Sequence, residues 1–190
     1  NSLDNPIVEG EYGILKTSCV YDYTFRPEEN KLILNDFELQ RAKTNPKKGM
    51  IIISRMNTPD LVGASGYIDK DYSNLFLPDR LWQTIFYQEV RLDSKWLSYV
   101  FKSSNFRSLL STLATGTSPS MKNIGQEDFL NIKIPFQGIK EQQSIVRHIE
   151  TECTRINAQI TKTKKLIELL TEYRTSLISE VVTGKIKVID

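Results

Sequence analysis

A heptad repeat near the C-terminus constrains this chain more than any other feature of its 190 residues. No proline or glycine lies between Gly138 and Gly184, so one unbroken helix can run through the repeat. Side chains at two positions of each heptad form a narrow stripe that packs against another long helix. One series of the stripe is Val146, Cys153, Ile160, Ile167, Arg174 and Val181, and the other is Ile149, Ile156, Thr163, Leu170 and Leu177.

A helix of about 40 residues is roughly 60 Å long, at ~1.5 Å per residue. Because such a rod cannot bury its stripe against one small domain, we predict a partner helix from another chain or from another part of a longer protein. Thr163 and Arg174 interrupt the apolar stripe. They either set register and partner choice, or they lie at an exposed point where the helices splay. The residues predicted to form the pairing contact are Ile149, Ile156, Ile160, Ile167, Leu170 and Leu177.

The chain changes character near Pro135, because only Phe136 and Tyr173 of its phenylalanines and tyrosines lie beyond that residue. The earlier part alternates short apolar runs with one helical pattern, which predicts a mixed α/β domain. We expect an α+β fold, with a globular domain over 1–137 and a long helix with a short tail over 138–190. The opening residues have no helix cap and no apolar periodicity, so we expect the chain to be part of a longer protein.

Apolar spacing and turn residues predict the elements of the first part. Ser94–Thr112 is expected to be one helix, capped by Asp93 or Ser94. Thr115–Ser120 is expected to be a small-residue loop, and Ile124–Ile134 to be extended or briefly helical. The predicted strands are Gly13–Val20, Leu32–Leu34, Met50–Ser54, Leu61–Ile68 and Gln83–Val90.

The net charge is only +2, but two windows of the sequence contain several basic residues and no acidic residue. These windows are Gln40–Pro59 and Ser94–Gln126. If both windows lie on one face, that face is suited to a polyanion. The alternative is two separate solvated surfaces. The basic residues are Arg41, Lys43, Lys47, Lys48 and Arg55 in the first window, and Lys95, Lys102, Arg107 and Lys122 in the second.

The sequence contains no convincing catalytic motif. The one histidine, His148, falls on an outward heptad position, away from any partner of a catalytic triad. Glycine-rich phosphate-binding motifs are absent. Asp22, Glu29 and Lys31 have the spacing of a metal-dependent nuclease, but no apolar strand presents them. We expect no catalytic residue and no metal site, and a nuclease is a minor alternative.

The two cysteines, Cys19 and Cys153, fit no metal-ligand spacing. Cys153 occupies a heptad core position, where a reduced thiol behaves as a small apolar residue. This cysteine usage predicts a reducing, cytoplasmic setting. No apolar run approaches the length of a membrane span, so no membrane partner is expected.

Two segments carry residues suited to DNA. In Ile53–Gly63 a buried strand leads to Arg55 and Asn57, which are suited to guanine and adenine edges. In Ala114–Ile124 small hydroxyl residues and Lys122 let backbone N–H groups and a cation approach phosphates. Either segment alone is also compatible with an ordinary polar turn.

Together with two further segments, Ile53–Gly63 and Ala114–Ile124 resemble one half of the specificity subunit of a type I restriction–modification system. The matching pieces are ISRMNTPDLVG at 53–63, ATGTSPSMKNI at 114–124, LNIKIPFQGIKEQQ at 130–143 and YRTSLISEVVTGKI at 173–186. The resemblance implies a target recognition domain that reads one half of a split DNA site. It also implies a spacer helix that pairs antiparallel with its counterpart in the other half. The chain departs from the usual plan in having one domain and one helix, and it lacks the Trp-containing start of a recognition domain. It is therefore expected to be either the C-terminal half of a longer subunit or a naturally short one.

By this resemblance the chain is a non-catalytic subunit that binds double-stranded DNA. Its other expected partners are methyltransferase subunits, restriction subunits, and a second half-subunit or a second copy of the chain. The helix and residues 128–150 are expected to hold the methyltransferase subunits. S-adenosylmethionine, magnesium and ATP are expected to bind the partner subunits. This chain is expected to bind no cofactor. The first alternative is a coiled-coil oligomerisation protein without a nucleic-acid role. The residues predicted to contact DNA are Lys43, Lys47, Lys48, Lys102, Arg107 and Lys122 at phosphates, and Arg55, Asn57, Thr117 and Ser118 near base edges.

Overall fold

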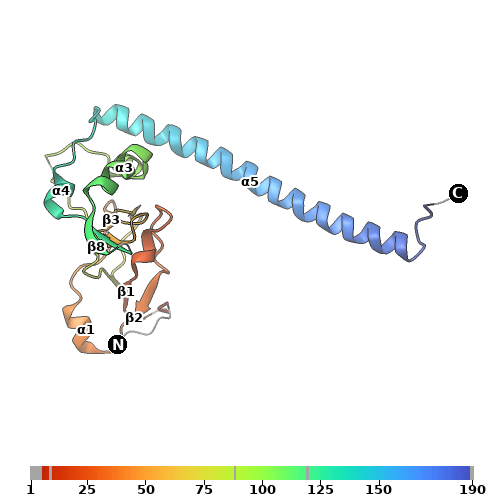
Figure 1. Ribbon diagram of the computed structural model, residues 1–190, viewed down its shortest axis with the longest axis horizontal. Helices are drawn as coiled ribbons and strands as arrows, with labels where there is room; N and C mark the ends of the chain where they lie inside the picture. The colour runs from red at the N-terminus through yellow and green to blue at the C-terminus, as the bar shows by residue number, and fades with distance from the viewer. Residues whose placement is uncertain (1–5, 9, 88, 119, 189–190) are drawn as a thin grey trace. The chain divides into compact units, whose positions relative to one another are not determined.

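A computed structural model describes residues 6–8, 10–87, 89–118 and 120–188, without the side chains of Thr117 and Ser118 (Figure 1). The chain divides into two compact units, Asn1–Gln143 and Ser144–Asp190. The first unit contains small β-sheets and short helices, and the second contains most of one long helix. The predicted α+β class with a long C-terminal helix is therefore confirmed.

A three-stranded antiparallel sheet forms the centre of the first unit. Strand β3 (Ile51–Ser54) lies between β5 (Ser65–Tyr67) and β7 (Leu81–Gln83). All four residues of β3 are buried, as its run of isoleucines predicts for a strand covered on both faces. The core on one side of it consists of Leu15, Cys19, Val20, Phe25, Ile52, Ala64, Ile68, Leu75 and Leu81.

A second small sheet contributes Leu15 and Leu75 to this core. Its central strand β1 (Gly13–Leu15) pairs antiparallel with β2 (Asn30–Leu32) and parallel with β6 (Leu75–Phe76). The sheet is short because the chain leaves the extended conformation soon after Leu15.

Four predicted strands differ from the observed ones. The strand predicted at Leu61–Ile68 is limited to Ser65–Tyr67, and the one predicted at Leu32–Leu34 begins earlier, at Asn30, and ends at Leu32. The predicted strand Gly13–Val20 is wrong beyond Leu15, because Thr17–Val20 forms the 3-10 helix η1. The predicted strand Gln83–Val90 is wrong beyond Gln83, where the ladder with β3 ends. Ile85 and Tyr87 are strongly exposed, so their apolar character does not reflect a buried strand.

The predicted helix Ser94–Thr112 is divided into α2 (Ser94–Lys102) and α3 (Ser104–Leu113). The intervening Ser103 has an extended backbone, with φ −63° and ψ 144°. Its Oγ accepts a hydrogen bond from the N–H of Phe106, so it ends one helix and caps the next. The continuous apolar periodicity of the sequence does not reveal this break.

Two of the short helices, α1 and α2, begin at side-chain caps that the sequence contains. Asp93 caps α2 as predicted, since its carboxylate accepts two backbone N–H groups of the first turn. Asn35 caps α1 (Asp36–Arg41), a helix that the sequence analysis did not predict. The predicted segment Ile124–Ile134 contains the five-residue helix α4 (Gln126–Leu130).

The long helix α5 runs over Ile139–Val182, a length of 44 residues. It ends before Gly184, whose φ of +72° leaves the helical region. The N–H of Lys185 then donates to the carbonyl of Glu180 at 2.9 Å, which satisfies one of the last carbonyls. The glycine that bounded the heptad in the sequence is therefore the helix terminator.

Candidate nucleic-acid interface

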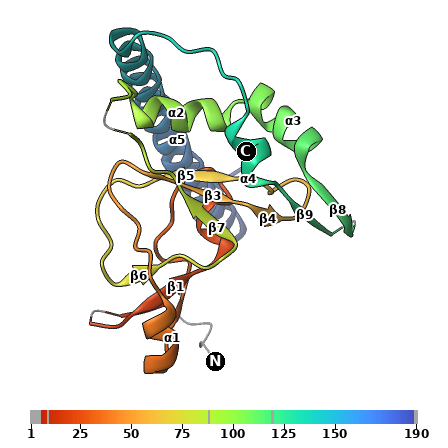
Figure 2. The ribbon, with the colours of Figure 1, turned by 90° about the vertical axis from the view of Figure 1, so that its left-hand side faces the viewer.

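The two segments with residues suited to DNA meet in a third sheet of the first unit (Figure 2). Strand β9 (Met121–Asn123) lies between β4 (Met56–Asn57) and β8 (Thr115–Ser118), and it is antiparallel to both. Asn57 is opposite Lys122 in this register. Residues more than sixty positions apart in the sequence therefore form one surface element.

The predicted loop Thr115–Ser120 is wrong, because its first four residues are strand β8 of a hairpin with β9. Gly116 has a φ of +140°, and a Cβ there would lie 2.7 Å from a backbone oxygen of β9. Lys122 reaches across the hairpin, and its Nζ donates to the carbonyl of Gly116 at 2.9 Å. Thr117 and Ser118, predicted near base edges, have side chains outside the described part of the structure.

Arg107 holds the turn over residues 58–63 against α3. Its Nη1 donates to the carbonyl of Val62 at 2.7 Å, and its Nη2 donates to that of Asp60 at 3.0 Å. The guanidinium also lies 5.3 Å from the ring centre of Tyr23. Arg107 was predicted to contact a phosphate, but the structure places its donors on the protein backbone. We therefore assign it a positioning role for the exposed turn.

Asn57 was predicted to lie near a base edge, but it is only 7% exposed. Its Nδ2 donates to Ser54 Oγ at 3.1 Å, and its Oδ1 accepts the N–H of Thr58 at 2.9 Å. The Tyr21 hydroxyl approaches the same oxygen at 3.5 Å. Because both ends of the amide are used inside the protein, Asn57 positions β4, and this burial does not fit the predicted base contact.

Arg55, which links β3 to β4, is half-buried. Its guanidinium carbon lies 6.0 Å from the ring centre of Trp82. The base-edge role predicted for Arg55 is taken up below.

Three of the residues predicted to contact phosphates are exposed, and two of them, Lys47 and Lys48, lie on anchored backbone. Lys43, Lys47 and Lys48 are exposed. The N–H of Lys47 donates to the Gln83 side chain, and the N–H of Lys48 donates to the Asp71 carboxylate, both at 2.9 Å. Their backbone is thus fixed while their side chains face solvent.

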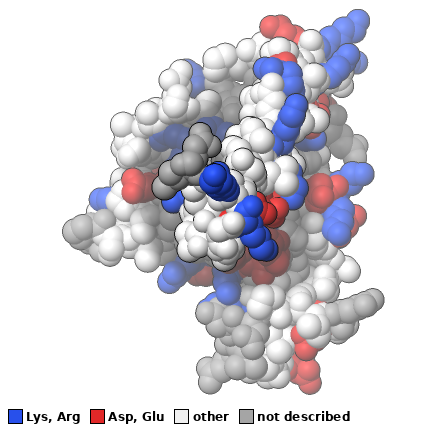
Figure 3. All heavy atoms as spheres, turned by 90° about the vertical axis from the view of Figure 1, so that its right-hand side faces the viewer, with Lys and Arg blue, Asp and Glu red and all other residues white. Residues whose placement is uncertain are grey.

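Lys102, on α2, has its ammonium 5.3 Å from the ring centre of Tyr99. On the face drawn in Figure 3, Lys and Arg side chains are interspersed with Asp and Glu, without one broad region of a single sign. A single positive face made by both basic windows therefore stays a prediction.

An open cleft of about 840 Å³ in the first unit was not predicted from the sequence. The ring centres of Trp82 and Phe129 lie 6.0 Å apart in the lining of the cleft, and Arg41 and Lys43 also line it. Sequence patterns could not identify the cleft, because its residues come from segments far apart in the chain. Its aromatic lining consists of Trp82, Phe86, Tyr87, Phe101, Phe106 and Phe129.

The residues of the nuclease alternative do not converge on one site. Asp22 forms an ion pair with Arg26 at 2.9 Å, and Glu29 accepts a hydrogen bond from the Ser18 hydroxyl. Glu29 and Lys31 line a shallow cleft whose lining does not include Asp22. Among the described residues, no group of three or more His, Cys, Asp or Glu side chains could hold a metal ion.

Within the first unit, the first turn of α5 is held by a residue that sequence reasoning missed. Gln142 is fully buried. Its Oε1 accepts the N–H of Asp93 at 2.8 Å, and its Nε2 donates to the carbonyl of Gln137 at 2.7 Å. This polar side chain joins the first turn of α5 to the cap of α2. The only feature of the sequence that could have pointed to Gln142 is its position in the segment 130–143, one of the four that carry the family resemblance.

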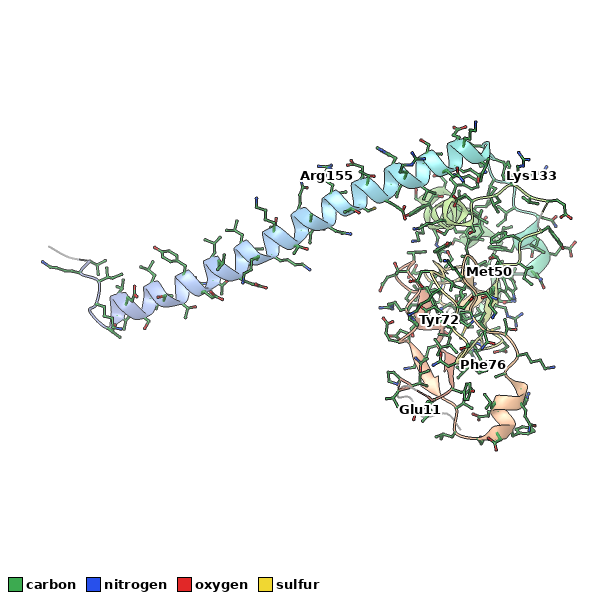
Figure 4. The ribbon with its side chains drawn as sticks, turned by 180° about the vertical axis from the view of Figure 1, so that it is seen from behind. Glu11, Met50, Tyr72, Phe76, Lys133 and Arg155 are labelled. Carbon is green, nitrogen blue, oxygen red and sulfur yellow. The ribbon has the colours of Figure 1, made fainter. Side chains whose placement is uncertain are left out.

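The predicted pairing residues of α5 face solvent. Figure 4 shows side chains, Arg155 among them, projecting from the helix along its length. Of the predicted contact residues, only Ile149 is half-buried. The others are between 38% and 58% exposed, namely Ile156, Ile160, Ile167, Leu170 and Leu177. A run of exposed apolar residues on one helix is typical of a surface that another helix covers.

Similarity to known proteins agrees with the resemblance seen in the motifs. Over 142 residues, which is 75% of this chain, the sequence is 25% identical to the specificity subunit of the type I restriction enzyme EcoEI from Escherichia coli. The match covers 24% of that subunit, so the chain spans about a quarter of its relative's length. No protein-family model matches the chain. Within the described residues, no helix combines the length and the apolar character that crossing a membrane requires.

Proposed function

We propose that the chain is a non-catalytic DNA-recognition subunit of a type I restriction–modification complex, or a part of one, and that it reads one half of a two-part DNA site. The observation that carries the proposal is the third sheet, which joins the two segments with residues suited to DNA. The similarity to the EcoEI specificity subunit over three quarters of the chain supports the same role.

The β8–β9 hairpin and the turn over 58–63 are the parts of this sheet that we propose to face DNA. The hairpin is closed by Lys122, whose ammonium keeps further donors for a phosphate after its bond to Gly116. Thr117 and Ser118 at the hairpin end are proposed to lie near base edges. Asn57 and Arg107 hold β4 and the turn in place through hydrogen bonds to the protein itself.

Phosphate contacts outside the sheet are assigned to Lys43, Lys47, Lys48 and Lys102. The first three are exposed, and Lys47 and Lys48 extend from anchored backbone, so that a cation can contact the DNA backbone without reading sequence.

The exposed stripe of α5 is proposed to pair antiparallel with a second long helix. That helix belongs either to a second copy of this chain or to another part of the same subunit. A rigid helix pair would fix the distance between two DNA-reading domains. Methyltransferase subunits are proposed to bind the helix and residues 128–150, and to carry the S-adenosylmethionine chemistry. Restriction subunits would carry the ATP and magnesium chemistry.

A salt titration of duplex DNA binding, with methyltransferase subunits present, tests the proposed function. Log affinity should fall by ~0.9 per neutralised phosphate for each log unit of salt. Lys47→Ala with Lys48→Ala should lower that slope, while Glu172→Gln on α5 serves as a control outside the recognition domain. Absent or salt-independent binding would contradict DNA recognition. Magnesium-dependent cleavage by the chain alone would favour the nuclease.

One observation favours a second candidate function, a helix-mediated oligomerisation protein without a nucleic-acid role. The exposed stripe on α5 would serve such a protein equally well. The two functions differ in the third sheet, because only DNA recognition requires a binding surface there.

A further inference from the structure

We infer that Arg55 binds a backbone phosphate of the DNA and does not read a base. This inference rests on the proposed function and assigns a specific contact within it. It replaces the base-edge role that the sequence alone predicted for this residue.

The backbone of Arg55 is fixed on both sides. Its N–H donates to the carbonyl of Arg80 at 3.0 Å, and its carbonyl accepts the N–H of Ile124 at 3.0 Å. These bonds tie the residue both to the turn before β7 and to the strand that carries Lys122. The side chain therefore starts from a rigid position next to the third sheet.

The guanidinium is also held, but it is not satisfied. It lies 6.0 Å from the ring centre of Trp82, which in turn packs against Phe129. Its Nε atom is buried and has no hydrogen-bond partner. Among the residues that the structure describes, no acidic side chain forms an ion pair with Arg55.

Other cations around the third sheet differ from Arg55 in this respect. Arg107 donates to two backbone carbonyls, and Lys122 donates to Gly116. Buried polar groups in proteins are nearly always hydrogen-bonded, and a half-buried cation without an acceptor is costly. Arg55 is thus a cation for which, among the described residues, no backbone or acidic acceptor is present. Because its Nε atom is buried, only its two Nη groups can donate to a ligand.

A phosphate fits this position better than a base edge. The planar guanidinium can donate two parallel N–H bonds to phosphate oxygens, and the negative charge compensates the partly desolvated cation. A base edge offers neutral acceptors and has to be reached within a groove by a protruding side chain. The Arg55 side chain is half-buried against Trp82, so it does not protrude far enough to enter a groove.

The test compares binding of the whole chain, with its methyltransferase subunits, to two duplexes. One duplex carries the site methylated in cells, and the other carries a scrambled sequence. Arg55→Ala should weaken binding to both by the same factor and lower the salt slope by ~0.9. Arg55→Gln removes the charge without a large loss of volume, so it gives the same comparison if the alanine variant unfolds. Lys187→Ala, which removes an exposed cation beyond the end of α5, is the control and should leave the slope unchanged.

Two results would overturn the inference while leaving the proposed function standing. The first is relaxed preference at one base pair with no change in slope, which would make Arg55 a base-reading residue. The second is wild-type affinity and slope for both variants, which would make Arg55 structural only. If the wild-type complex itself showed no salt-dependent binding, the proposed function would fail, and the role of Arg55 with it.

Discussion

At the scale of single residues, the structure divides the predicted DNA-contacting side chains into those that face solvent and those that hold the surface together. Lys43, Lys47 and Lys48 belong to the first group. Asn57 and Arg107 belong to the second, because their polar atoms bond to the protein itself. Residue type alone does not separate the two groups, since arginine and asparagine serve both purposes equally well.

Arg107→Lys tests this division. Lysine keeps the charge but cannot span the carbonyls of Val62 and Asp60 as the forked guanidinium does. We expect a loss of about 1–2 kcal/mol in the free energy of unfolding, measured with denaturant. Arg91→Lys, at an exposed position, should change stability by less than about 0.5 kcal/mol. Equal stability of both variants and wild type would show that Arg107 does not position the turn.

The two cysteines should differ sharply in reactivity. Cys19 is fully buried, and burial, with a smaller effect of the Glu29 charge, raises the pKa of its thiol to about 12. Cys153 is exposed on α5. In the unassembled chain, where no partner helix covers α5, a maleimide at neutral pH should therefore modify Cys153 rapidly and Cys19 hardly at all, because the thiolate is the reactive form. Mass spectrometry after labelling measures this, and rapid labelling of Cys153→Ser would contradict the buried position of Cys19.

At the scale of elements, the sequence predicted what repeats and missed what depends on tertiary contacts. The helix α5 follows from the heptad and its flanking glycines, and β3 follows from its isoleucine run. The break at Ser103 and the β8 strand have no such local signal. The break at Ser103 depends on a helix cap that leaves the apolar spacing intact. Strand β8 forms because it pairs with β9, which also pairs with β4. The burial of Asn57 escaped prediction for the same reason.

Gly63 should be indispensable to the turn over 58–63, which we propose to face DNA. Its φ is +73°, and a Cβ there would lie 2.5 Å from the Leu110 side chain and 3.0 Å from Arg107 Nη1. Gly63→Ala should cost about 1–3 kcal/mol of stability in thermal or denaturant unfolding. Gly138→Ala is the matched control, since a Cβ at Gly138 would meet nothing within 4 Å. Similar stabilities for the two variants would mean that the turn can adapt.

The stripe of α5 can be tested by placing a charge in it. Leu170→Asp should abolish assembly in sedimentation experiments while circular dichroism still reports a helical, folded chain. Ala158→Asp, on the opposite side of the heptad, has a similar cost in helix propensity and should leave assembly intact. Unchanged assembly of the Leu170 variant would mean that this stripe is not the pairing surface.

At the scale of the whole molecule, the chain combines a globular unit that brings two separate DNA-suited segments together and a long helix with an uncovered apolar stripe. Neither part needs catalytic residues for the proposed function. Recognition requires a rigid surface, and spacing requires a rigid rod. In the proposed function, side chains at the hairpin and the turn set the base sequence recognised, so the scaffold alone does not encode it.

Sequencing of DNA methylation in cells tests the central claim most directly. It should compare cells that carry this gene and its methyltransferase partners with cells from which this gene alone is deleted. The proposed function predicts methylation at a two-part site that disappears on deletion and returns on complementation. A palindromic site would indicate two copies of this chain, and an asymmetric one a subunit with two different recognition domains. Methylation that is the same with and without the gene would contradict the role in DNA recognition.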